Sequence, residues 1–128
     1  MKIPKAIRIL LAAIAVTLLG AGVFWHDNYG PTAFDPVAWR QGEQAEFSPD
    51  ALRLRMADGL VQSKVLVGKP KAEVLAMLGA PSQTDKFKEY DLVYWLGAER
   101  GFISIDSEWM VLQCTETGIV KEACIVRD

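Results

Sequence analysis

Apolar residues run without interruption from Ile9 to Trp25, where Thr17 is the only polar side chain. As a helix, this segment measures about 26 Å, close to the ~30 Å hydrocarbon core of a bilayer. The three charged side chains that precede it are all basic, so the positive-inside rule places residues 1–8 in the cytoplasm. We therefore predict that residues 1–25 are a cytoplasmic stub and a single-pass inner-membrane anchor, with the C-terminal domain in the periplasm.

A cleaved secretory signal is the alternative explanation of the same segment. The small residues Gly20-Ala21-Gly22 would supply the cleavage site, and the domain would then be released into the periplasm. The apolar run continues through Val23-Phe24-Trp25, which favours an uncleaved anchor. No cysteine lies near the small residues, so this chain has no thiol there for lipidation.

Residues 26–48 lack a sustained hydrophobic period and contain two prolines that each bias the preceding residue away from helix. We expect a linker between the membrane and the domain. Its apolar side chains suggest that part of it docks on the domain as a short first element; these are Phe34, Val37, Trp39 and Phe47.

Two helices are predicted at the start of the domain. Ser48-Pro49-Asp50 is typical of a helix N-terminus, and helical spacing of apolar residues then predicts a helix over 49–64, with Arg53 outside its apolar stripe. A second helix covers 71–79, where Gly79 should end it with a positive φ and Pro81 prevents its continuation. The short connection predicts antiparallel neighbours.

After Gln83 the hydrophobic period changes to two, which predicts strands over 89–96, 108–115 and 119–126. Their short connections require antiparallel pairing. We therefore predict an α+β fold over residues 49–128, in which two helices pack on one face of a three-stranded antiparallel sheet in the order ααβββ.

The chain has 128 residues, which is room for one domain of average size, and it is 51% hydrophobic. Its net charge is −2, divided into +3 over residues 1–25 and −5 over the remainder. No basic surface for nucleic acid is expected. Two cysteines and one histidine are too few for a four-ligand zinc site within one chain.

The two cysteines lie in the predicted hairpin around Thr117-Gly118. If these residues form a two-residue turn, residue i faces residue 235−i, so Cys124 faces Val111 and Cys114 faces Lys121. The cysteines then lie about 10 Å apart on opposite faces, beyond the ~7 Å reach of a disulfide. We expect two separate thiols. A bulge would change which face of the sheet each cysteine occupies, and a disulfide would then be possible.

No catalytic motif is present, and we predict no enzymatic activity, cofactor or metal. The acidic stretch of Glu99, Asp106 and Glu108 is the best candidate for acid–base chemistry or for Ca²⁺ binding. Asp106 and Glu108 should share a face of the strand, where Arg100 can pair with one of them. A structural or binding loop is the simpler interpretation of these acids.

Aromatic residues gather on the first two predicted strands and their loop. Because side chains alternate along a strand, Tyr94 and Trp95 must point to opposite faces, and one of them faces away from the helices. An aromatic residue on an open sheet face suits a protein contact, unless residues 30–47 fold back and cover it. The candidate partner-binding residues are Tyr94, Trp95, Phe102, Asp106, Glu108 and Trp109.

The segment KPKAEVLAMLGAPS carries a resemblance, through Gly68, Val74, Leu78-Gly79 and Pro81, followed by the aromatic Tyr94-Trp95. Residues 50–126 resemble the small envelope proteins of the SmpA/OmlA (BamE) family and the wider helix-helix-three-strand fold of the β-lactamase inhibitor protein. The resemblance implies a non-enzymatic envelope protein that binds a protein partner. This chain differs by keeping an apolar helix in place of a lipid-carrying cysteine.

These features predict a membrane-anchored, non-enzymatic envelope protein that binds a protein partner in envelope assembly or maintenance. The alternative is a periplasmic module that binds a small ligand or a lipid in a pocket between the helices and the sheet.

Overall fold

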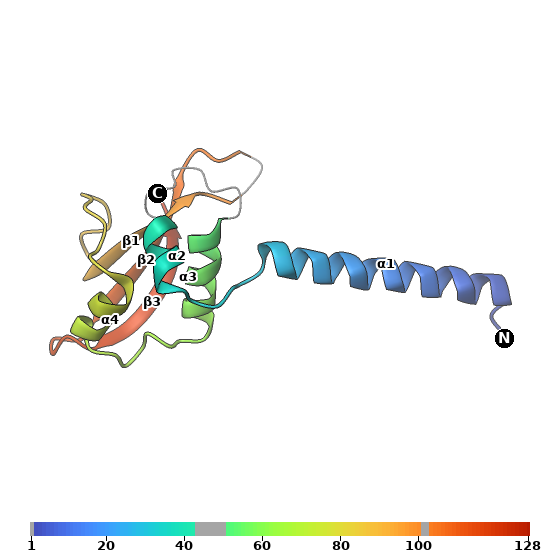
Figure 1. Cartoon of the computed structure of the whole chain (residues 1–128), viewed down its shortest axis with the longest axis horizontal. Helices are drawn as coiled ribbons and strands as arrows, with labels where there is room; N and C mark the ends of the chain where they lie inside the picture. Colours follow the sequence, from blue (N-terminus) through green and yellow to red (C-terminus); the bar gives the residue numbers. More distant parts are fainter. Residues whose placement is uncertain (1, 43–50, 101–102) are drawn as a thin grey trace. The chain divides into compact units, whose positions relative to one another are not determined.

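The computed structural model describes residues 2–42, 51–100 and 103–128, and it divides into two compact units, Met1–Gly30 and Pro31–Asp128. The first unit consists of one helix, α1 (Lys5–Tyr29) (Figure 1). Among the described residues, Lys5–Trp25 is the one stretch of helix long and apolar enough to cross a membrane, a property that an N-terminal signal sequence shares. The predicted N-terminal apolar helix is thus confirmed.

The second unit is an α+β domain with an open, three-stranded antiparallel sheet in the order β1-β2-β3, as the sequence predicts (Figure 1). The strands begin within three residues of the predicted positions. The elements are α2 (Pro36–Gly42), α3 (Leu52–Gln62), α4 (Lys71–Leu78), β1 (Leu92–Ala98), β2 (Ser107–Cys114) and β3 (Val120–Arg127).

The helical layer contains a third helix, where the sequence analysis expected a short docked element without assigning it as a helix. Helix α2 lies within the expected linker and contacts both α3 and α4. Its Trp39 is completely buried, and the indole Nε1 donates a hydrogen bond to the Leu78 carbonyl oxygen at 3.0 Å. The ring also lies 6.1 Å from the ring of Tyr94, centroid to centroid. The expectation of two helices on the sheet is therefore incomplete, because the core of the domain includes α2.

The position of α2 changes which side of α3 is buried. Arg53, which lies outside the apolar stripe, is only 3% exposed because Trp39 covers it, with the guanidinium carbon 4.5 Å from the ring centroid. The predicted cap at Ser48 lies outside the described residues, and α3 itself begins at Leu52.

A glycine in α3 lets the segment after α1 lie close to the helix. Thr32 donates its backbone N–H to the Arg55 carbonyl oxygen at 3.1 Å. A Cβ on Gly59 would stand 2.9 Å from the Thr32 carbonyl oxygen, too close for any side chain. The helix-weakening glycine thus has a packing reason, and the chain belongs to the domain from Thr32 onward.

The main core lies between the helices and one face of the sheet. Tyr94 contributes from β1, and its hydroxyl donates to the Gly79 carbonyl oxygen at 3.0 Å. Gly79 has the predicted positive φ, 84°, at the end of α4. The buried strand residues on this face are Leu92, Tyr94, Leu96, Met110, Leu112 and Val120.

The cysteines are free thiols, as predicted, and they lie on opposite faces of the sheet. Cys124 pairs with Val111 in the predicted register. Cys114 faces Val120 instead of Lys121, because the register shifts between Gln113 and Cys114. Burial raises the pKa of both thiols, so they are less reactive than exposed cysteines.

Replacing Trp39 by alanine should lower the free energy of unfolding by about 3–5 kcal/mol, because it empties a fully buried site between α3, α4 and β1. The matched control is Val37→Ala on the same helix, whose side chain is 61% exposed and whose loss should cost under about 0.5 kcal/mol. Chemical denaturation of the full chain measures both. Equal effects of the two substitutions would show that α2 is not part of the core.

Candidate functional site

The face of the sheet away from the helices carries a second apolar cluster, here called the open-face cluster. Val111 in the central strand is its most buried member, at 0% exposure. None of the helical residues that the structure describes belongs to this cluster. Its members are Phe87, Tyr90, Val93, Trp95, Trp109, Val111, Cys124 and Val126.

Trp109 at the centre of this cluster has an unsatisfied donor. The side chain is 9% exposed, and its Nε1 is buried without a hydrogen-bond partner among the described residues. Such a donor costs roughly 1–3 kcal/mol compared with one that is hydrogen-bonded. The ring of Phe87 lies against it, with the centroids 6.0 Å apart.

The segment before β1, not the segment after α1, partly covers the open face. Phe87 and Tyr90 pack on the strands from this side, and Phe87 has a φ of 56°, which is unusual for an aromatic residue. The alternative that residues 30–47 cover this face does not hold for residues 31–42, which pack on the helical side through Trp39. Residues 43–47 lie outside the described part of the chain.

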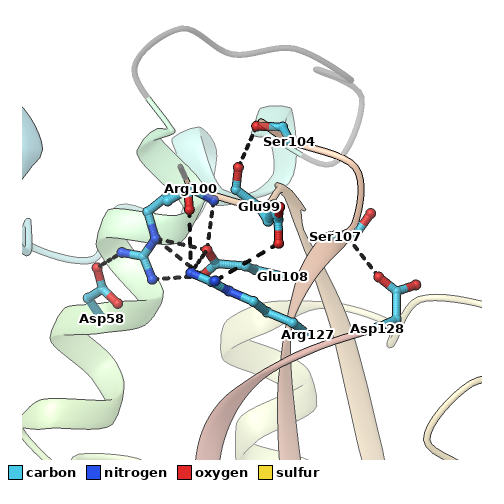
Figure 2. Close-up of polar contacts among 8 residues, drawn as sticks. All are labelled: Asp58, Glu99, Arg100, Ser104, Ser107, Glu108, Arg127 and Asp128. Carbon is cyan, nitrogen blue, oxygen red and sulfur yellow. Dashed lines mark hydrogen bonds and ion pairs between the residues drawn. The ribbon is translucent and has the colours of Figure 1, made fainter. Parts of the chain in front are cut away.

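On the helical side of β2, the buried carboxylate of Glu108 accepts hydrogen bonds from two arginines (Figure 2). It is 1% exposed and accepts hydrogen bonds from the backbone N–H of Arg100 at 2.8 Å and from its guanidinium Nη2 at 2.7 Å. Arg127 of β3 reaches the same carboxylate at 3.2 Å. Arg100 also pairs with Asp58 of α3, so it connects the helical layer to the sheet. Arg100 was expected to pair with either Asp106 or Glu108, and the structure shows that its partner is Glu108.

These contacts decide the charge state of Glu108. Burial alone would raise the pKa of this carboxyl group, but the hydrogen bonds from Arg100 and the charges of Arg100 and Arg127 outweigh it and hold the pKa below its ordinary value. Glu99 is likewise paired with Arg127, at 3.9 Å. Within the described residues, no three His, Cys, Asp or Glu side chains form a group that could hold a metal ion.

Hydrogen bonds close the base of the loop between β1 and β2, and the loop carries two exposed isoleucines. Glu99 donates its backbone N–H to the Asp106 carbonyl oxygen at 2.9 Å. The Ser104 hydroxyl donates to the Glu99 carbonyl oxygen at 2.7 Å (Figure 2). Ile103 and Ile105 are 65% and 81% exposed. The ion pairs of Arg100 thus hold a loop that presents two large apolar side chains to solvent.

The six candidate partner-binding residues separate into different environments. Trp95 and Trp109 belong to the open-face cluster, and Asp106 is exposed in the loop. The prediction that Tyr94 and Glu108 contact a partner is wrong, because both side chains are buried on the helical side and offer no surface to a partner. Phe102 lies outside the described residues.

The sequence analysis missed two members of the charged cluster. The register 235−i places Arg127 opposite Glu108, so the hairpin already contained the signal for that contact. Asp58 carried no comparable signal, because its contact with Arg100 joins segments 42 residues apart.

Comparisons of the chain with protein-family models, curated proteins and solved structures found no significant match.

Glu108→Gln should lower the free energy of unfolding at neutral pH by about 2 kcal/mol, since it removes charged hydrogen bonds and leaves two arginines facing a neutral group. Because the folded-state pKa of Glu108 is lowered, its contribution is present above the ordinary pKa of 4.5 and is lost as the pH falls through the folded-state value.

Denaturation of both proteins between pH 7 and pH 3 measures this difference. The stability gap between wild type and Glu108→Gln should narrow below pH 4.5. A difference in the free energy of unfolding that stays constant with pH would contradict the conclusion that Glu108 is ionised and paired with the arginines.

Proposed function

We propose that this chain is a membrane-anchored, non-enzymatic envelope protein whose domain binds a protein partner in envelope assembly or maintenance. The observation that carries the proposal is the open-face cluster, where aromatic side chains gather on a sheet face that no described helix covers. Aromatic anchors of this kind dominate the binding energy of protein interfaces.

The exposed Ile103 and Ile105 extend the apolar surface available to a partner. We assign the contact to Trp95 and Trp109, with the loop around Asp106 as a second contact.

The proposed location follows from α1. We infer that Lys5–Trp25 crosses the inner membrane once, with the basic residues 1–8 in the cytoplasm and the domain in the periplasm. Only Gly30 and Pro31 separate the end of α1 from Thr32, which is already bonded to the domain. The folded domain therefore begins directly after this helix along the chain.

The resemblance to SmpA/OmlA (BamE) proteins supports an envelope role without catalysis. It rests on the Leu78-Gly79 helix end, with Pro81 and the aromatic first strand, and it remains a resemblance in sequence pattern. The alternative, a small-ligand or lipid site between helices and sheet, has less support, because the large side chains at that boundary are completely buried; these include Trp39, Tyr94, Leu54, Met56 and Met110.

Trp95→Asp should abolish recovery of a crosslinked partner from membranes that contain the intact chain, because a charge enters the apolar contact. Thr117→Asp in the exposed β2–β3 turn is the matched control and should leave the crosslink unchanged. Circular dichroism should show both variants folded. If folded Trp95→Asp keeps the crosslink, the open face is not the binding surface.

N-terminal sequencing of the chain from the membrane fraction should return the uncleaved terminus at Met1. A mature terminus at Val23 would show instead that the segment is a cleaved signal sequence.

A further inference from the structure

Residues 83–90, here called the strap, form no helix or strand and run between two points that are fixed on the sheet. Before the strap, the backbone N–H of Ser82 donates to the Val93 carbonyl oxygen at 2.9 Å. After it, the backbone N–H of Asp91 donates to the Leu112 carbonyl oxygen at 3.0 Å. The strap is therefore a surface loop whose two ends are held by strands.

The backbone of the strap bonds to itself. The Tyr90 N–H donates to the Phe87 carbonyl oxygen at 3.0 Å. The Lys86 N–H donates to the Thr84 hydroxyl at 3.1 Å. In the described part of the chain, no backbone hydrogen bond joins residues 83–90 to another segment. Segments without such bonds open at a lower free energy than the strands to which they are attached.

Side chains connect the strap to the sheet. The ring of Phe87 lies 6.0 Å from that of Trp109 in the central strand, centroid to centroid, and Tyr90 packs on the same open-face cluster. Lys86 pairs with Asp128, the residue after β3. Because an ion pair of an exposed lysine contributes little, the aromatic contacts do most to keep the strap on the open face.

The backbone of Phe87 is strained in this closed position. Its φ of 56° lies in the left-handed region, where the side chain of an aromatic residue crowds its own backbone. Such a conformation persists only where the surrounding contacts enforce it. In the strap the contact that does so is the one between Phe87 and Trp109, so the strain would be released if the strap opened.

Trp109 differs from the tryptophan in the main core. The Trp39 indole N–H donates to the Leu78 carbonyl oxygen, whereas the buried Trp109 Nε1 has no hydrogen-bond partner among the described residues. Buried indole groups are usually hydrogen-bonded. The contact between strap and sheet thus joins a strained residue to an unsatisfied one, which makes it weaker than the contacts of the main core.

We propose that the strap is an autoinhibitory cover of the open-face cluster, and that Phe87 occupies the place on Trp109 that an apolar side chain of the protein partner takes. The partner binds when the strap opens, so the strap and the partner compete for one surface. This inference deepens the proposed function by naming a regulation of its binding surface, and it rests on that function.

The two cysteines supply a readout of strap opening that needs no partner. Cys124 belongs to the open-face cluster, whereas Cys114 packs against the main core on the other face. A negative charge on Cys124 raises the pKa of Tyr90, so the strap lies near this thiol. Opening of the strap should therefore expose Cys124 and leave Cys114 unchanged.

Two lysine variants of the full chain in detergent micelles test this opening. Lys86→Ala removes the ion pair with Asp128, and Lys88→Ala is the matched control, because its exposed lysine pairs with Asp85 inside the strap. Lys86→Ala should raise the rate at which N-ethylmaleimide labels Cys124 by about 1.5-fold to fivefold, the range expected for one surface ion pair. Lys88→Ala should leave that rate at the wild-type value.

A third variant tests the competition. Phe87→Gly removes the ring and accepts a positive φ, and it should raise the yield of crosslinked partner from membranes at least about twofold, because one aromatic contact no longer opposes the partner. A Phe87 that only stabilises the fold would lower the yield instead. Circular dichroism and an unchanged labelling rate of Cys114 show whether the variant is folded. If it is not, the crosslink yield of Lys86→Ala decides and should also rise.

Two results would overturn the proposal. Equal labelling of Cys124 in Lys86→Ala and Lys88→Ala would show that the strap does not open. An unchanged or lower crosslink yield in folded Phe87→Gly, or in Lys86→Ala if Phe87→Gly is unfolded, would show that the partner does not replace the strap. The labelling is measured without a partner, so its failure is distinct from failure of the proposed function, which Trp95→Asp tests separately.

Discussion

The architecture of the domain depends on the burial of one indole ring. Trp39 lies between Arg53 of α3, the end of α4 and Tyr94 of β1, and its N–H is satisfied by the Leu78 carbonyl oxygen. A buried tryptophan of this size requires partners on all sides. The short helix α2 is therefore held on the helical side of the sheet, together with the chain that leads to it from Thr32.

This constraint makes the two faces of the sheet unequal. The helical face is closed by three helices and, at one end, by the ion pairs around Glu108, which connect α3, β2, β3 and the loop after β1. Among residues 31–42, 51–100 and 103–128, the side chains from outside the sheet that pack on the other face are Phe87 and Tyr90, from the segment before β1. Because α2 packs on the helical face, it does not cover the open-face cluster. The proposed partner contact uses this cluster.

The sheet could be predicted from the sequence because its signals are local. Alternation placed the strands, and the Thr117-Gly118 turn fixed a register that holds from Glu108 to Gln113. The bulge beyond Gln113 could not be predicted, because it lies where Val120 exchanges backbone hydrogen bonds with residues 68–69, far from it in the sequence. Alternation also separates Tyr94 from Trp95 and Glu108 from Trp109, but it does not say which face the helices cover, so the burial of Tyr94 and Glu108 follows from the packing.

The third helix was harder to predict because α2 spans seven residues, too few for a hydrophobic period to emerge. One signal was present: Asp35 precedes Pro36, and the Asp35 carboxylate accepts a hydrogen bond from the Ala38 N–H at 2.7 Å, as a helix cap does. The contact of Asp58 with Arg100 depends on tertiary packing alone.

Hydrogen exchange at the Trp39 indole N–H in the full chain tests the central role of this residue most directly. If Trp39 closes the core, its indole proton exchanges only on global unfolding, with the same opening free energy as the backbone amides of β2. Exchange at the rate of a free indole, while the amides of β2 stay protected, would show that α2 is a detachable part of the linker.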